Sequence, residues 1–341
     1  MAHITLVLPF ALPLPEFAPD LVRALQAPAF SALLSRTSSA RRAPKADIAH
    51  ALPHETWLAR ELGLIPDNRD GHTPFAVAAM RGFGLDPGAG RWHIVTPAHI
   101  QIARSHLMMA DTRQVSLDDA DGRALFETAR SLCEEIGHEL RYGDAHTWFL
   151  RADDWTGFET ASPDTVANMD LTDFMPKGAG AQAYRRLQNE VQMAWHAHPV
   201  NAAREARRLP VVNAFWVWGA SAQAQQSATK MATYAVPGWL AALGQQRLPS
   251  LERLNDVLAQ GGLLVAGNLG EAALAADWNG WLQGMQHLED TLFAPLLAAL
   301  KDGRVRELRL VLSSREALAD YTTTAMAQRK FWRRPTLDSL T

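Results

Sequence analysis

Four short apolar runs, separated by segments of helical periodicity, limit the fold of this chain more than any other feature. Each run has four or five residues and is almost entirely apolar. Strands that are buried on both faces have this character, and they occur in sheets that helices cover. The sequence therefore predicts an α/β protein whose central mixed sheet contains strands at Ile4–Leu8, Phe215–Trp218, Leu263–Ala266 and Leu308–Leu312.

The pattern changes between residues 91 and 180. Trp92–Ile102 and Thr147–Arg151 have the composition of strands, and Leu117–Ile136 has the periodicity of a helix between them. This order predicts a smaller α+β flanking subdomain with its own sheet. The expected division is an α/β core domain formed by residues 1–90 and 181–341, with an inserted subdomain at residues 91–180.

Length and composition describe a soluble globular chain. It has 341 residues, of which 48% are hydrophobic and 20% charged, so it can bury a core in one large or two smaller domains. A net charge of −3 gives no general attraction to nucleic acid or to an anionic membrane, so such binding would have to be local. No apolar run approaches the roughly 18 residues of a membrane helix. The single cysteine, Cys133, excludes an internal disulfide and suits the cytoplasm, where we expect the protein.

One segment, Asn189–Gly219, combines several side chains of chemical use. An amphipathic helix ends at Pro199, a short helix follows, and Pro210 precedes a buried strand. The corner between these elements offers imidazole, amide and guanidinium groups, which bind carboxylate or phosphate. The predicted ligand-binding residues are His196, His198, Asn201, Arg204, Arg208 and Asn213. The alternative is structural, since the same side chains satisfy loose backbone groups in many turns.

Two other segments are basic. Thr37–Lys45 contains Arg41, Arg42 and Lys45, and its prolines and polar residues favour a solvated loop. Arg329–Arg334 has the sequence RKFWRR. Nucleic-acid binding is one interpretation of that segment, and a helix end lying on the protein body is the favoured one.

Two longer passages carry a resemblance to known families. In Arg185–Gly219 the matching positions are Asn189-Glu190, His198-Pro199-Val200-Asn201, Arg204, Leu209-Pro210 and Asn213 to Gly219. This passage resembles the RpfE-type regulatory proteins of proteobacteria, and that resemblance extends over nearly the whole chain. It is similar, more weakly, to a passage of the archaeal-type cofactor-independent phosphoglycerate mutases. The second passage, Trp278–Leu312, resembles the last metal-bearing portion of those mutases, which belong to the alkaline-phosphatase-like superfamily.

The mutase resemblance implies an alkaline-phosphatase-like central mixed sheet, two divalent metals held by aspartates and histidines, and a serine nucleophile. The chain departs from that pattern at two places. The strand Ile4–Leu8 runs into Phe10 with no aspartate, and Arg315 follows the last strand where an Asp-His pair would close the metal site. Because a cation opposes metal binding by direct repulsion, we predict no metal ligands, no cofactor and no catalytic residues.

These departures favour a non-catalytic, regulatory relative of the mutases that binds a phosphorylated or carboxylated metabolite. The alternative is an active phosphoglycerate mutase or a metal-dependent phosphatase-like enzyme, with ligands from Asp277, His287, Asp290 and Asp320. A third interpretation is a purely structural interaction protein. The sequence names neither the metabolite nor a protein partner.

Overall fold

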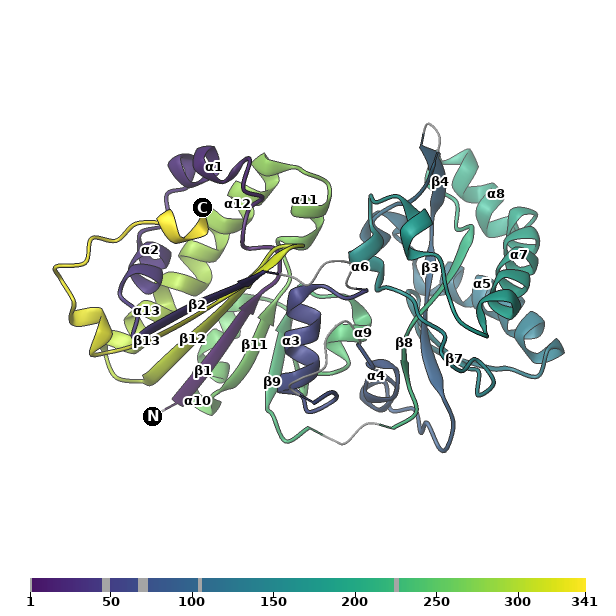
Figure 1. Cartoon of the computed structure of the whole chain (residues 1–341), viewed down its shortest axis with the longest axis horizontal. Coiled ribbons are helices and arrows are strands. Elements are labelled where there is room, and N and C mark those ends of the chain that lie inside the picture. The colour runs from purple at the N-terminus through teal and green to yellow at the C-terminus, as the bar shows by residue number, and fades with distance from the viewer. Residues whose placement is uncertain (1, 45–49, 67–72, 104–105, 224–226) are drawn as a thin grey trace.

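The two larger β-sheets lie in different halves of an elongated molecule, with a layer of short helices between them (Figure 1). The computed structural model describes residues 2–44, 50–66, 73–103, 106–223 and 227–341. Within these ranges the larger sheet has seven strands, in the order β10 (Gln246–Leu248), β9 (Met231–Tyr234), β11 (Gly262–Ala266), β1 (Ala2–Leu8), β12 (Val305–Ser313), β13 (Ala317–Thr324) and β2 (Ser39–Pro44). The smaller sheet has four, in the order β6 (Glu139–Asp144), β7 (Thr147–Arg151), β3 (Trp92–Ala98) and β8 (Ala214–Ser221). A third sheet within the described ranges has only two strands, β4 (Ile100–Ala103) and β5 (His106–Met109).

The larger sheet is mixed. Strand β1 pairs in parallel with β11 on one side and with β12 on the other, and β9 and β10 continue the parallel part. Strands β13 and β2 extend the sheet in antiparallel pairing beyond β12. The predicted central mixed sheet is confirmed, and Ile4–Leu8, Leu263–Ala266 and Leu308–Leu312 share it. The carboxyl ends of its parallel strands lie along one edge.

Strand β2 lies in a segment for which the sequence predicts a loop. Residues 39–44 were expected in a solvated loop, and they form the edge strand beside β13. Strand pairing uses backbone groups, so a polar, basic segment can occupy an edge where its side chains reach water. Lys45, the last residue of that predicted loop, lies outside the described residues.

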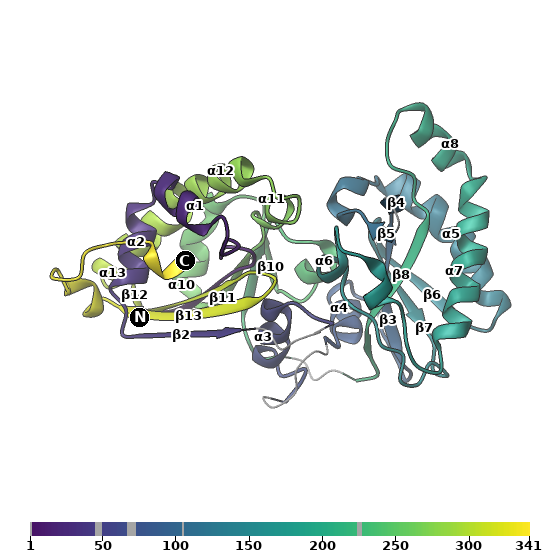
Figure 2. The ribbon, with the colours of Figure 1, turned by 45° about the horizontal axis from the view of Figure 1, so that its top comes forward.

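One face of the larger sheet is covered by helices from both ends of the chain (Figure 2). Alternate residues of β1, including Leu6 and Leu8, point into this layer with Leu310 of β12. The covering helices are α1 (Ala18–Ala24), α2 (Pro28–Ser35), α10 (Leu254–Gln260), α11 (Gly270–Leu274), α12 (Trp278–Leu288) and α13 (Ala294–Lys301), with a π-helical turn at Glu289–Phe293 between the last two. No helix in the described ranges is long and apolar enough to cross a membrane.

The π-helical turn places a carboxylate beneath helix α2. Glu289 is buried, and its two carboxylate oxygens accept hydrogen bonds from the backbone N–H groups of Ala29 and Phe30 at 2.6 and 3.0 Å. Helix α2 has no capping side chain of its own, so Glu289 satisfies two of its free N–H groups. Glu289 belongs to the passage that resembles a metal-bearing segment, and here it acts as a structural cap of helix α2.

The opposite face of the larger sheet shares one apolar core with the smaller sheet. Val7, Val265 and Val311 point into this core from the larger sheet, and Trp216 and Trp218 enter it from the smaller one. Between them lie helices α3 (Pro53–Glu61), α4 (Ala76–Gly82) and α9 (Gly238–Ala241) (Figure 1). The two sheets are therefore joined by continuous packing.

The far face of the smaller sheet carries its own helices. Helices α5 (Asp119–Glu135) and α7 (Ala181–His196) pack against it, with α8 (Pro199–Ala206) at one end. Cys133 is buried there as a free thiol, and burial raises its pKa to about 12. The thiolate needed for nucleophilic chemistry is therefore disfavoured.

Strand β8 is the one predicted core strand that was assigned to the wrong sheet. Its residues Phe215–Trp218 pair with β3 in the smaller sheet. Every residue of β8 is buried, because one set of side chains meets α7 and the alternate set enters the shared core. A strand that is buried on both faces has the same sequence pattern in either sheet. Helices α7 and α8 and strand β8 therefore pack with the smaller sheet, whereas the sequence predicts residues 181–341 in the core domain.

Candidate functional site

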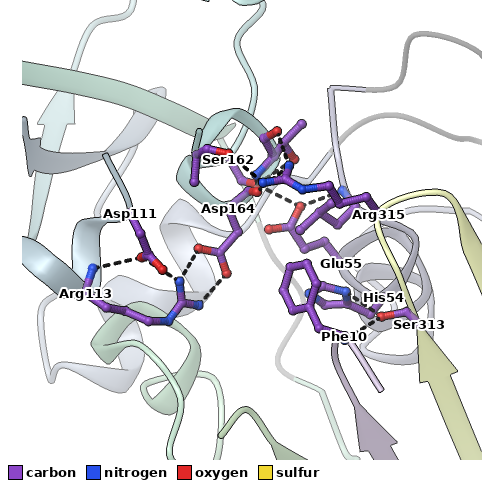
Figure 3. Close-up of polar contacts among 12 residues, drawn as sticks. Phe10, His54, Glu55, Asp111, Arg113, Ser162, Asp164, Ser313 and Arg315 are labelled. Atoms are coloured by element: carbon purple, nitrogen blue, oxygen red, sulfur yellow. Dashed lines mark hydrogen bonds and ion pairs between the residues drawn. The ribbon is translucent and has the colours of Figure 1, made fainter. Parts of the chain in front are cut away.

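The carboxyl edge of the larger sheet faces helix α6 (Pro163–Val166), which belongs to the half of the molecule that contains the smaller sheet (Figure 1). In open α/β sheets, ligands bind outside the carboxyl ends of the strands. The side chains that gather at this edge come from Phe10 after β1, His54 and Glu55 of α3, Ser313 and Arg315 at the end of β12, Ser162 and Asp164 around α6, and Asp111 and Arg113 (Figure 3).

An ion-pair network centred on Arg113 occupies this edge. Arg113 holds Asp164 in a bidentate contact, with Nη1–Oδ1 at 2.8 Å and Nη2–Oδ2 at 2.6 Å, and its Nη1 also donates to Asp111 Oδ1 at 2.9 Å. The Asp111 side chain is fully buried and that of Asp164 is 13% exposed. Burial alone would raise the pKa of Asp164, but the Arg113 charge and hydrogen bonds hold that pKa below its usual range. The carboxylates of Asp111 and Asp164 are therefore both already bound to the Arg113 guanidinium.

A second guanidinium joins β12 to α6. Arg315 donates from Nη1 to the carbonyl oxygens of Asp164 and Thr165 at 3.2 and 2.9 Å, and from Nη2 to that of Ala167 at 2.5 Å. These carbonyls lie at the end of α6, where the backbone has free acceptors. Burial lowers the pKa of Arg315, and the Asp164 charge acts in the opposite direction. Arg315 thus fastens the last parallel strand to the other half of the molecule.

Ser313 and His54 form a close pair beside Phe10. The Ser313 hydroxyl oxygen lies 2.9 Å from His54 Nδ1 and accepts a hydrogen bond from the Phe10 backbone N–H at 3.4 Å. A serine at this distance from an imidazole has the geometry of an activated nucleophile. Here, however, Ser313 has no exposed surface, and its hydroxyl oxygen binds the Phe10 N–H in the turn after β1. Burial lowers the pKa of His54 to about 4, so its ring is neutral at neutral pH.

Glu55 supports the same region from helix α3. Its carboxylate accepts hydrogen bonds from the Leu52 backbone N–H at 2.8 Å and from the Ser162 hydroxyl at 2.9 Å. Ser162 in turn caps α6 by accepting a bond from the Thr165 backbone N–H. Glu55 therefore connects the start of α3 to the start of α6 and has a structural role at this edge.

The residues at the edge do not fit the two divalent metals that the mutase resemblance implies. The described part of the chain contains no group of three or more His, Cys, Asp or Glu side chains that could hold an ion. Asp111 and Asp164 already bind Arg113, and Arg315 adds a further positive charge. A divalent ion would have to displace a guanidinium from a largely buried carboxylate.

The four residues considered as alternative metal ligands do not converge either. Asp277 caps helix α12 by accepting a bond from the Gly280 N–H, and Asp320 pairs with Arg309 across β12 and β13 at 2.6 Å. His287 and Asp290 are exposed on the outer side of the α12 segment. In the described part of the chain, these four side chains therefore do not form a common metal site.

The side chains of the predicted anion-binding corner mainly form hydrogen bonds with backbone groups. The Asn201 amide donates to the carbonyls of Trp195 and Val212 and accepts from the Val212 N–H, all at 2.8 Å. Asn213 makes a similar two-way contact with the Ile100 backbone at 2.7 and 2.8 Å. These are the contacts that the structural alternative describes.

The basic residues of that corner do not act together. Arg204 is buried and donates to the backbone oxygens of Pro210, Ser116 and Val115. His198 caps helix α8 through its Nδ1, and Arg208 is exposed at the following turn. A concavity of about 510 Å³ beside α7 is lined by His196, Asn201 and Asn213, but not by the other three predicted ligand-binding residues. Anion binding at this corner remains a prediction.

A smaller concavity is lined in part by Arg113 and Asp164. It has a volume of about 220 Å³, and elements of both sheets line it. Arg247 of β10 reaches this cleft with an exposed side chain, and no ion pair is found for it among the residues that the structure describes. His146 lines the cleft near Arg113, while Asp144 contributes a negative charge.

Sequence reasoning identified Arg315 but missed Arg113, Asp111 and Asp164. The segment Asp111-Thr112-Arg113 follows strand β5 (His106–Met109), and Asp164 comes 51 residues after Arg113. No short spacing joins the pair. Only Pro163 after Ser162, which marks a capped helix start, could have indicated that Asp164 occupies a defined position.

Comparisons with known proteins give one relative and two structures of interest. No protein-family model matches the chain. A curated relative, the probable 2,3-bisphosphoglycerate-independent phosphoglycerate mutase of Geobacter sulfurreducens, is 26% identical over 193 residues, which cover 49% of this chain and 48% of the relative. The chain thus spans about half the length of the curated relative it matches.

Two solved structures resemble the chain over almost its full length. The PH0037 protein of Pyrococcus horikoshii has a TM-score of 0.52 at 12% identity and covers 99% of this chain and 91% of its own. The cofactor-independent phosphoglycerate mutase of Thermoplasma acidophilum has a TM-score of 0.42 at 12% identity, with 100% and 94% covered. The chain is therefore distantly similar to phosphoglycerate mutases in sequence, and it shares the mixed α/β fold of the PH0037 structure.

Replacing Asp164 with Asn tests the ion-pair network. The Arg113 guanidinium would keep only Asp111 as a charged partner, so we expect the free energy of unfolding to fall by about 3 kcal/mol. Urea unfolding followed by circular dichroism measures this change. The matched control is Asp119→Asn, which breaks the exposed Arg123–Asp119 pair and should leave the stability close to that of the wild type. Equal effects of the two changes would contradict a structural role for the network.

The buried His54 predicts a pH dependence of stability. Its pKa is about 4 in the folded chain and about 6.5 when unfolded, so the unfolded chain binds more protons between these values. Stability is therefore retained above pH 6.5 and lost as the pH falls toward 4. In His54→Asn, the loss between pH 7 and roughly 4.5 should be smaller than in the wild type by about 2.5 kcal/mol.

Denaturant titrations at both pH values measure this difference. The control variant, His287→Asn, changes an exposed histidine on α12 and should keep the wild-type pH dependence. If His54→Asn and the wild type lose the same stability on acidification, His54 is not held neutral by burial.

Proposed function

We propose that this protein is a non-catalytic, regulatory relative of the phosphoglycerate mutases that binds a small anionic metabolite in the cleft between its two sheets. The observation that carries the proposal is the bidentate contact between Arg113 and Asp164 at the carboxyl edge of the larger sheet. In the mutases, the resemblance places metal-binding acids and histidines at such an edge. In this chain the acids there hold arginine.

The charge at this edge supports loss of two-metal chemistry. Two-metal catalysis uses both ions to stabilise the attacking and leaving oxygens and needs acids that are free to bind them. Arg113 and Arg315 supply fixed positive charge next to Asp111 and Asp164, and Phe10 follows β1 where the resemblance expects an aspartate. Arginine cannot activate a nucleophile by binding it as a metal does, because its guanidinium stays protonated.

The serine at this edge gives no support for a substitute mechanism. Ser313 lies within hydrogen-bond distance of His54, but it has no exposed surface and holds the backbone N–H of Phe10. A nucleophilic hydroxyl must come within about 3–3.5 Å of the reacting atom of the substrate. In the folded chain, no substrate can approach Ser313 this closely without displacing the turn after β1.

Arg247 is the side chain best placed to bind a ligand. It lies in the 220 Å³ cleft between the sheets and is exposed, whereas Arg113 is already paired with two carboxylates. A guanidinium suits carboxylate or phosphate oxygens, and the small volume suits a compact anion. His146 lies in the same cleft and offers a second polar contact. The regulatory role rests on the resemblance to RpfE-type proteins.

Turnover and binding assays on the purified chain test the proposal together. With 3-phosphoglycerate and excess Mn²⁺, we expect no formation of 2-phosphoglycerate, while an active cofactor-independent mutase run in parallel confirms the assay. Calorimetric titration with 3-phosphoglycerate or inorganic phosphate should show saturable binding. Arg247→Met removes a charge-assisted contact worth roughly 1.5–3 kcal/mol, so the Kd should rise by about 10- to 150-fold.

Two control variants locate the binding site. Arg306→Met changes an exposed arginine of β12 and should leave the Kd unchanged. His196→Ala alters the larger concavity beside α7, and a loss of binding in this variant alone would place the ligand at the predicted polar corner instead. Metal-dependent conversion of 3-phosphoglycerate by the wild type would contradict the non-catalytic proposal, whichever site binds.

A further inference from the structure

We propose that the loop after β13, residues 325–337, is a docking site for the surface of an anionic lipid bilayer. This terminal loop contains the segment RKFWRR. The interpretation favoured from sequence was a helix end that lies on the protein body. In the structure a 3₁₀ turn, Ala327–Arg329, is followed by an extended loop that projects from the end of the molecule (Figures 1 and 2).

The terminal loop has an unusual density of exposed apolar side chains. Five large apolar side chains among the described residues are more than two-thirds exposed, and three of them lie in this loop: Met326 at 75%, Phe331 at 82% and Trp332 at 69%. Single exposed apolar residues are common, but a cluster of large ones marks a surface that contacts something else. The two adjacent aromatic rings meet edge to face, with centroids 5.2 Å apart.

The loop that carries these exposed side chains is anchored to the rest of the protein. The Lys330 ammonium donates to the Thr37 carbonyl at 2.8 Å, and Arg36 Nε donates to the Arg333 carbonyl at 3.4 Å. The Ser35 hydroxyl donates to the Thr336 carbonyl and accepts from the Thr336 N–H, at 3.0 and 2.9 Å. These bonds fix both sides of the aromatic pair to the end of helix α2. The rings are therefore held outward by the fold.

The charged side chains of the terminal loop all have one sign. Residues 321–337 contain Arg329, Lys330, Arg333 and Arg334 and no aspartate or glutamate. Within the described part of the chain, no ion pair is found for any of these four cations. The whole chain has a net charge of −3, so this positive charge is local. A patch of this kind attracts a surface that presents many negative charges.

Shape and composition together favour a bilayer over a nucleic acid strand. Tryptophan and phenylalanine enter the interfacial region of a membrane, while lysine and arginine beside them contact lipid phosphates. A projecting loop with apolar rings and a basic surround fits a flat surface of this kind. Single-stranded nucleic acid is bound in grooves in which bases stack on aromatic faces, and the edge-to-face contact of Phe331 with Trp332 covers part of one face.

Vesicle co-sedimentation with the full chain tests the proposal. We expect binding to vesicles of phosphatidylcholine with roughly 30 mol% phosphatidylglycerol, little binding to phosphatidylcholine alone, and weaker binding at high salt, because the attraction is partly electrostatic. The double variants F331S/W332S and R333S/R334S should each reduce the vesicle partition coefficient by at least about tenfold. All four side chains are exposed, and the one anchoring bond lost, from Arg333 Nη1 to the Ser35 carbonyl at 3.3 Å, is exposed too, so the melting temperature should stay close to the wild-type value.

Matched control variants change equivalent side chains elsewhere. Met193→Ser replaces a 74% exposed apolar side chain on α7, and R185S/R186S removes two exposed arginines of the same helix. Both should bind vesicles as the wild type does. Absence of vesicle binding, or binding that survives F331S/W332S, would overturn the proposal. Binding of an oligodeoxythymidine through the same loop, without vesicle binding, would overturn it in favour of a single-stranded nucleic acid site.

Discussion

The contact between Arg113 and Asp164 is the interaction on which the candidate site depends. A largely buried carboxylate needs a partner, and Arg113 supplies it through two short hydrogen bonds while also pairing with Asp111. The pair holds α6 in place, and α6 then offers its backbone oxygens to Arg315 at the end of β12. Two guanidinium groups thus occupy the edge of the sheet where a two-metal site would need free acids.

This network lies beside the apolar core that the two sheets share. Val7 and Val311 of the larger sheet and Trp216 and Trp218 of the smaller one belong to the same cluster, with short helices between them. Such packing restricts how far the sheets can move apart, because separation would expose large aromatic surfaces to water. The small cleft that contains Arg247 is present in this arrangement of the two sheets.

The sequence predicted the fold class and most of the large sheet, because apolar runs flanked by helices leave few other arrangements. The prediction for strand β8 was wrong because the sequence of a strand buried on both faces does not indicate which sheet the strand joins. The absence of an aspartate at Phe10 and the presence of Arg315 were visible in the sequence. The pairing of Arg113 with Asp164 was not, since it joins two turns far apart in the chain. At the polar corner, Asn201 and Arg204 bind backbone atoms, which residue types alone could not distinguish from ligand binding.

Titration of Mn²⁺ into the purified protein, followed by calorimetry, tests most directly whether arginine has replaced metal at this edge. Arg113 and Arg315 repel a divalent ion, and Asp111 and Asp164 are already paired, so the account predicts no saturable binding at concentrations up to roughly 1 mM. Saturable binding of about two ions per chain in the micromolar range would contradict it, because a two-metal site needs acids that are free to bind both ions.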